Sequence, residues 1–196
     1  MRDETNSPIA RAEEYMKERK FGDAGKCFEE AAASVVDKRE SIEFLKKAAQ
    51  AYEGSGVTDD DALRCYLEAS QFLDKTEKAE CLLACFRVYV SKIAGYEYDC
   101  GFEWRGATDG SHDDDHEFYQ EKIKQYQSEA EKVLREALSI EGADKNQIIR
   151  QAKDECTRRK GEGGWGESAC WFIKMPLEYP SACWRDEKGF AEGEYF

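Results

Sequence analysis

The stretch FGDAGKCFEEAAA, residues 21–33, places an aromatic ring between two small residues on one helical face. Phe28 follows Ala24 by four positions and precedes Ala31 by three, which is the spacing of neighbours on one side of an α-helix. Small residues allow a second helix to approach closely, and the ring fills the space beside them. The stretch is consistent with an ordinary amphipathic helix. More specifically, it predicts one half of a helical hairpin that recurs along the chain.

The same small–ring–small pattern recurs at a fixed distance. The second set lies 38 residues after the first, and a third set, in which leucine replaces the ring, lies 68 residues beyond the second. The three sets are Ala24, Phe28 and Ala31; Ala62, Tyr66 and Ala69; and Ala130, Leu134 and Ala137. A small residue three positions before a tyrosine precedes each of the first two sets, as Ala12 with Tyr15 and Ala49 with Tyr52. One hairpin cannot bury its apolar face alone, whereas stacked hairpins can.

These residues resemble the tetratricopeptide repeat (TPR) family. The matching positions are Ala12, Tyr15, Ala24, Phe28 and Ala31 in one unit, and Leu45, Ala49, Tyr52, Ala62, Tyr66 and Ala69 in the next. The long period and the phrases AGKCFEEAA and KKAAQAYE are similar to the TPR-like repeats of soluble NSF attachment proteins (SNAPs). The resemblance covers residues 8–95 and part of 114–160. It implies an all-α fold, a right-handed α-solenoid of antiparallel helix hairpins, and the alternative is a generic alanine-rich helical bundle.

Apolar periodicity and helix-forming composition predict seven helices before residue 160. Their ranges are 9–20, 22–36, 39–54, 59–73, 76–95, 114–140 and 144–160. We expect one repeat domain over residues 1–160, with an aromatic insertion or long loop at about 96–113. Residues 161–196 have many glycines, two prolines and three tryptophans without helical periodicity. We expect this irregular C-terminal segment to pack on the repeat domain.

The charge balance limits the partners. The formal net charge of −13 opposes binding to nucleic acid or to anionic membranes, both of which require clustered Lys and Arg. It favours a protein or peptide partner with a basic surface. No run approaches the ~20 apolar residues of a membrane span, and the N-terminus has no apolar signal-peptide core. We therefore expect a cytoplasmic protein without membrane insertion.

The resemblance implies a binding function and names candidate residues. TPR-like arrays bind proteins or peptides on a concave face lined by the first helix of each pair, and the matching positions are Ile9, Glu13, Lys46 and Gln50. Ile9 and Glu13 cannot complete a clamp for a C-terminal carboxylate, which requires cationic or amide donors. Lys46 and Gln50 remain as candidate binding residues of an adaptor or scaffold. The SNAP resemblance implies a coiled-coil assembly or an oligomeric ATPase as the partner.

The insertion supplies a second group of candidate binding residues. Tyr96, Tyr98, Phe102 and Trp104 would form an aromatic patch of the kind that dominates protein interfaces. No nucleophile has an evident base near it in sequence, and the glycines of GEGGWGES lack the spacing of a phosphate-binding loop. We therefore predict that the protein is not an enzyme.

Two alternatives compete with a scaffold. Cys100, His112 and His116 have a spacing that resembles half of a zinc finger, although Glu97 stands where a second cysteine is expected. Zinc is therefore the one cofactor considered. The other alternative is a self-associating structural protein. Four further cysteines, Cys27, Cys65, Cys81 and Cys85, lie within helical patterns and are predicted to be buried thiols.

Overall fold

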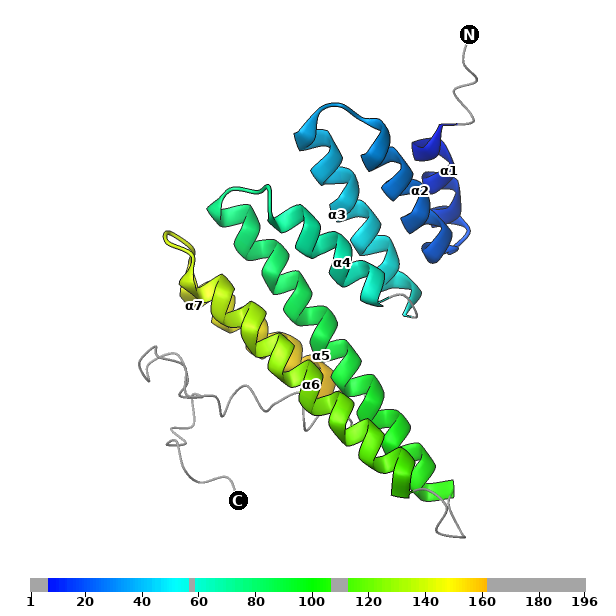
Figure 1. Ribbon diagram of the computed structural model, residues 1–196, viewed down its shortest axis with the longest axis vertical. Coiled ribbons are helices and arrows are strands. Elements are labelled where there is room, and N and C mark those ends of the chain that lie inside the picture. Colours follow the sequence, from blue (N-terminus) through cyan, green and yellow to red (C-terminus); the bar gives the residue numbers. More distant parts are fainter. Residues whose placement is uncertain (1–6, 57–58, 107–112, 162–196) are drawn as a thin grey trace. The chain divides into compact units, whose positions relative to one another are not determined.

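The computed structural model describes residues 7–56, 59–106 and 113–161, with side chains for 7–56, 59–99 and 117–158. These residues form seven α-helices and no strand, which confirms the predicted all-α class (Figure 1). The helices are α1 (Pro8–Lys17), α2 (Phe21–Ser34), α3 (Lys38–Ser55), α4 (Asp59–Ser70), α5 (Lys75–Gly106), α6 (Asp113–Ser139) and α7 (Lys145–Gly161). Each corresponds to one predicted helix, although α1 and α4 end early and α5 extends well beyond its predicted end.

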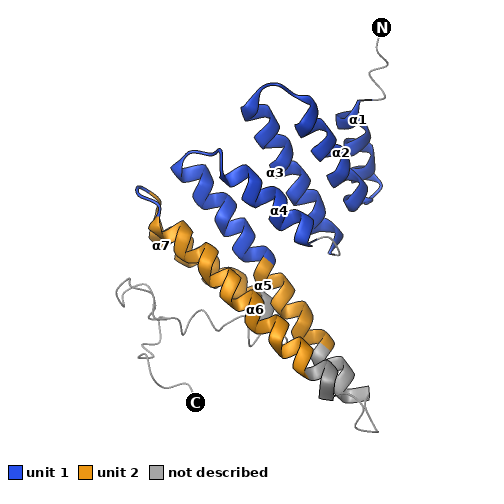
Figure 2. Ribbon diagram, in the orientation of Figure 1, with its two compact units in different colours: residues 1–88, 140–142 blue, residues 89–139, 143–196 orange. Residues whose placement is uncertain are grey.

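The chain divides into two compact units (Figure 2). Unit 1 comprises residues 1–88 and 140–142, and unit 2 comprises residues 89–139 and 143–196. Helix α5 contributes to both. No sequence signal marks this division, because helical periodicity continues without a break through Val88.

Buried small residues hold the helices of unit 1 close together. Helix α2 packs against α1 and α3, and α3 packs against α4. Ala24, Ala62 and Ala69 are completely buried, and the rings of Phe28 and Tyr66 are more than nine-tenths buried. The predicted small–ring–small faces therefore form core. In unit 2 the third set, Ala130, Leu134 and Ala137, is also completely buried.

A glycine next to the predicted alanine lets the Tyr52 ring of α3 pack directly on α2. A Cβ atom on Gly25 would lie 2.5 Å from Cε1 of Tyr52, a separation that real side chains do not adopt. Tyr52 is 2 % exposed, so its ring cannot move aside into solvent. The backbone of α2 is thus the surface against which the α3 ring packs.

The connections between hairpins share one capping pattern. The sequences DKRE at 37–40, DKTE at 74–77 and DKNQ at 144–147 each begin a helix. Asp37 Oδ1 accepts from the Glu40 amide at 2.9 Å, Asp74 Oδ1 from the Glu77 amide at 3.1 Å, and Asp144 Oδ1 from the Gln147 amide at 3.0 Å. Each aspartate satisfies an amide that the first helical turn leaves without a partner. The backbone amide of Thr76 also donates to Asp74 Oδ1, at 3.1 Å.

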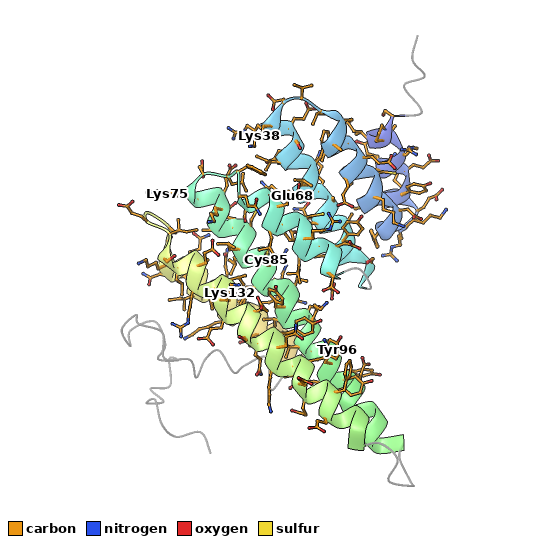
Figure 3. All side chains as sticks on the ribbon, in the orientation of Figure 1. Lys38, Glu68, Lys75, Cys85, Tyr96 and Lys132 are labelled. Atoms are coloured by element: carbon orange, nitrogen blue, oxygen red, sulfur yellow. The ribbon has the colours of Figure 1, made fainter. Side chains whose placement is uncertain are left out.

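The lysine after each of the first two caps contacts the next connection along unit 1. Lys38 Nζ lies 3.6 Å from the ring centroid of Phe72, and Lys75 Nζ lies 2.5 Å from Glu141 Oε2. Figure 3 labels both lysines at the starts of α3 and α5. The three connections are therefore linked in sequence along one edge of the unit.

The predicted loop at 96–113 is wrong over most of its length. Helix α5 continues through Gly106 and α6 begins at Asp113, so the aromatic stretch is helical. Helices α5 and α6 have 32 and 27 residues, compared with 18 and 12 for α3 and α4. Residues 96–106 therefore extend α5, whereas α6 begins and ends within one residue of its predicted bounds. Aromatic pairs between α5 and α6 compensate for the low helix propensity of glycine, because ring contacts add to apolar burial.

The C-terminal segment 162–196 and residues 107–112 lie outside the described residues, so the predicted packing of the C-terminal segment remains a prediction. Over the residues that are described, no helix combines the length and the apolar character of a membrane span.

The tight contact at Gly25 gives a stability prediction. Gly25→Ala should destabilise the protein by about 1–3 kcal/mol, because overpacking against Tyr52 outweighs the ~1 kcal/mol that alanine gains in helix propensity. Urea unfolding followed by circular dichroism would measure the change.

Gly22→Ala is the matched control in the same helix. A Cβ atom on Gly22 meets nothing within 4 Å, so this variant should be neutral or slightly stabilised. Equal stability of the two variants would contradict the proposed contact.

Candidate functional site

A groove of about 640 Å³ lies between α2, α3 and α4 in unit 1. Its lining combines an apolar base with charged walls. The lining residues are Lys26, Glu29, Glu30, Ala32, Ala33, Ser41, Leu45, Arg64 and Glu68.

The base of the groove is formed where α3 passes between α2 and α4. Leu45 and Ala32 are buried, whereas Ala33 is exposed at the edge. The Ser41 hydroxyl donates to the Ala32 carbonyl oxygen at 2.9 Å and fixes the start of α3 against the end of α2. The groove is therefore walled by helices whose separation is set by direct contacts.

Glu29 organises one wall of the groove. Its Oε2 accepts from the Tyr52 hydroxyl at 2.7 Å, and its Oε1 accepts from the Cys65 thiol at 3.3 Å and from Arg64 at 2.5 Å. These three donors come from α3 and α4, while Glu29 belongs to α2. One carboxylate thus connects three consecutive helices.

Glu53, on α3, likewise connects three consecutive helices. Its carboxylate accepts from the Tyr66 hydroxyl on α4 and from Arg87 on α5, with two Arg87 contacts at 2.7 and 3.1 Å. Each junction therefore uses a glutamate, a tyrosine on the next helix and an arginine on the helix after that. We call these the Glu29 junction and the Glu53 junction.

The environment of the Glu29 junction shifts the pKa values of its members. Burial alone would raise the pKa of Glu29, but the hydrogen bonds from Tyr52, Arg64 and Cys65 outweigh it and the pKa is lowered. Burial, followed by the negative charge of Glu29, raises the pKa of the Cys65 thiol to about 12. Burial and the hydrogen bond to Glu29 also raise the pKa of Tyr52. At neutral pH the glutamate is therefore the charged acceptor and both donors keep their protons.

The predicted binding residues Lys46 and Gln50 lie on α3 but do not line this groove. Gln50 is exposed, and Lys46 Nζ lies 3.1 Å from Glu43 Oε1. Burial would lower the pKa of Lys46, but the hydrogen bond and charge of Glu43 raise it. The negative charge of Glu77 on α5 also raises the pKa of Lys46.

The predicted aromatic patch lies in unit 2. Tyr96 contacts two rings of α6, with centroids 5.5 Å from Tyr126 and 6.0 Å from Tyr119. Tyr98 is 49 % exposed. Phe102 and Trp104 lie on α5, but their side chains are outside the described residues, so the structure does not test their membership of the patch.

The predicted zinc ligands are only partly covered. Cys100 lies on α5 and His116 in the first turn of α6, both without described side chains, and His112 lies between the two helices outside the described residues. Among the side chains that are described, no three His, Cys, Asp or Glu residues are grouped as a metal site.

The cysteines predicted to be buried are confirmed as buried free thiols. Cys27, Cys65, Cys81 and Cys85 belong to this group, and Cys156 on α7 joins them. Burial raises the pKa of Cys85 to about 12 and that of Cys81 to about 11. These thiols stay protonated at neutral pH and serve as small apolar residues.

Sequence reasoning missed the residues of both junctions. Glu29 and Arg64 resemble ordinary charged positions of amphipathic helices, and their separation of 35 residues becomes meaningful only when the helices are placed. The recurrent Asp-Lys caps, by contrast, are visible in the sequence and would have located the hairpin connections.

Comparisons of the chain with protein-family models, with curated proteins and with solved structures found no match. The TPR-like resemblance therefore rests on the residues quoted above.

The lowered pKa of Glu29 gives a prediction for acid unfolding. A carboxylate whose folded pKa lies below its unfolded value stabilises the fold above the unfolded pKa, and this contribution is lost as the pH falls through the folded pKa. Relative to wild type, Glu29→Gln should lose about 1–3 kcal/mol of unfolding free energy at pH 7, and the gap should close in acid. Urea unfolding measured from pH 7 to pH 3 would test this.

Glu68→Gln is the control, since Glu68 is exposed on the same groove and forms no ion pair with any described side chain. Its pH profile should follow wild type. If Glu29→Gln and wild type lost stability in parallel, the Glu29 junction would not contribute as described.

Proposed function

We propose that this protein is a non-catalytic scaffold that binds a protein or peptide, and that its helices form a TPR-like α-solenoid. Three observations support the architecture. Consecutive helices of unit 1 pack together, the Glu29 and Glu53 junctions each connect three successive helices, and the Asp-Lys caps recur at the hairpin connections. Contacts of this kind between nearest and next-nearest helices are what a stacked hairpin array requires.

The groove between α2, α3 and α4 is the observation that carries the binding function. Its volume of about 640 Å³ is in the range of ligand-binding clefts. The apolar base at Leu45 and Ala32 accommodates an apolar side chain, and the walls present charge to its flanks. We therefore propose a binding surface beside α2 and α4, and the predicted binding residues Lys46 and Gln50, which lie on α3 outside the groove, stay an untested alternative.

The wall charges favour a partner with basic residues. Arg64 is engaged by Glu29 and by Asp61, so its charge is largely compensated. Glu68 has no ion-pair partner among the described residues, and the whole chain carries a net charge of −13. A basic segment therefore gains favourable long-range attraction and a local acceptor. The expected cytoplasmic location is part of this proposal.

Selection from a random peptide library would provide ligands for a direct test. In wild type we expect peptides with an apolar residue flanked by Lys or Arg, and Ala33→Arg should weaken their binding roughly tenfold or more, about 1.4 kcal/mol, by filling the groove. Titration calorimetry would measure the dissociation constants.

Gln50→Arg introduces the same side chain at an exposed position outside the groove, and it should leave those constants unchanged. A library that yields no binder would overturn the scaffold function. Loss of binding in Gln50→Arg alone would instead place the ligand on the first-helix face of α3.

A further inference from the structure

The lengthened hairpin of unit 2 carries a row of aromatic rings that the groove does not use. Successive ring centroids lie 6.2 Å apart for Tyr89 and Tyr126, 5.5 Å for Tyr126 and Tyr96, 6.0 Å for Tyr96 and Tyr119, and 5.6 Å for Tyr119 and Phe118. We call this row the aromatic ladder. Figure 3 labels Tyr96 on the part of α5 that runs beside α6.

The exposure of the rings increases along the ladder from Tyr89 to Phe118. Tyr89 is 8 % exposed, whereas Phe118 at the other end is 50 % exposed, and the three rings between them are partly exposed. An exposed ring at the end of a continuous aromatic row is a surface that favours an apolar or aromatic partner.

Two lysines lie over the ladder. Lys92 Nζ lies 4.8 Å from the ring centroid of Tyr126, and Lys122 Nζ lies 5.8 Å from that of Phe118. The same parts of α5 and α6 also carry the exposed acidic residues Asp99, Glu117 and Glu121, so positive charge beside the rings is confined to these two lysines. Such a surface suits a segment that combines apolar rings with acidic residues.

The chain itself supplies a segment of that composition. Residues 171–180 read WFIKMPLEYP, with three aromatic residues, two prolines and Glu178. Prolines favour an extended polyproline conformation, which docks on aromatic surfaces at low entropic cost. Residues 171–180 contain one lysine, Lys174, and one acidic residue, so Glu178 is the group of this stretch that can pair with a lysine of the ladder.

The point where α7 ends brings this segment within reach. Helices α6 and α7 are in contact and are joined by a short turn, so α7 runs back along α6. At 1.5 Å per residue, Gly161 lies about 24 Å along α7 from its start, and Tyr126 lies about 20 Å from the end of α6. Helix α7 therefore ends close to the level of the ladder. Trp171 follows Gly161 by ten positions, a length of chain that spans up to about 33 Å.

The described side chains of α7, residues 145–158, include no exposed large hydrophobic residue. Its apolar residues Ile148, Ile149, Ala152 and Cys156 are all buried, and the large hydrophobic residues exposed in the described part of unit 2 are Tyr98 and Phe118. The cap of an array must present a polar outer face, and α7 meets this requirement by itself.

We propose that residues 171–180 dock on the aromatic ladder of the same chain, with the rings and prolines on Tyr96, Tyr119 and Phe118 and with Glu178 beside Lys122. This docking is independent of the groove in unit 1.

Photocrosslinking in the full-length chain tests the proposal. With p-benzoylphenylalanine in place of Phe118, irradiation followed by peptide mass spectrometry should give cross-links to residues 165–184 within one chain, with a yield that does not change on dilution. The same substitution at Phe72 is the matched control, because Phe72 is also aromatic and is 48 % exposed, but belongs to unit 1. It should give no such cross-links.

A charge exchange tests the register. Lys122→Glu should lower the cross-linking yield severalfold, and adding Glu178→Lys should restore it, an outcome that a general loss of stability cannot produce. Cross-links from position 118 that are absent, that join two copies of the chain, or that match those from position 72 would overturn the proposal.

Discussion

The contact of the Tyr52 ring with the backbone of α2 at Gly25 is the constraint on which unit 1 depends. The Tyr52 ring of α3 sets how closely α3 can approach α2 at Gly25. The Tyr52 hydroxyl donates to Glu29, which lies on α2 like Gly25. Glu29 can then accept from α4 only because α3 already lies at this distance. A larger residue at position 25 would move the hydroxyl away from its acceptor as well as forcing the helices apart, so packing and polar geometry are coupled at one point.

The apolar contacts supply most of the stability, and the Glu29 and Glu53 junctions determine the relative orientation of the helices. Side chains such as Ala24, Ala49 and Ala62 are removed entirely from water, whereas Arg64 and Arg87 remain 50 % and 41 % exposed, and exposed ion pairs contribute little free energy. Alanine faces alone would allow neighbouring helices to rotate or shift relative to one another. Such movements would break the hydrogen bonds of a glutamate that accepts from a tyrosine and an arginine on two different helices. The junctions thereby define which of several close packings is adopted, and they position the walls of the groove.

The number, type and order of the helices followed from residue periodicity, because 3.6-residue spacing and end signals are local. The alanines around Phe28 and Tyr66 also identified the buried faces. The loop prediction failed over residues 96–106, where aromatic residues, glycines and acids resembled a loop but the chain is helical. Tyr96 in this stretch contacts Tyr119 and Tyr126, and contacts between residues so far apart in sequence cannot be found from local patterns. The groove could not be predicted for the same reason, since Glu29, Leu45 and Arg64 come from three helices and none carries a distinctive local pattern.

The five buried thiols of the described residues are protected from reagents while the helices that contain them stay packed. Because Cys65, Cys81 and Cys85 keep their protons to high pH and have almost no contact with water, reagents that attack thiolates reach them only after a helix separates from its neighbours. Since α2, α4, α5 and α7 each contain at least one of these thiols, alkylation rates would report the opening of individual helices in the unlabelled native chain. The protein thus contains an intrinsic set of probes for its own local breathing motions.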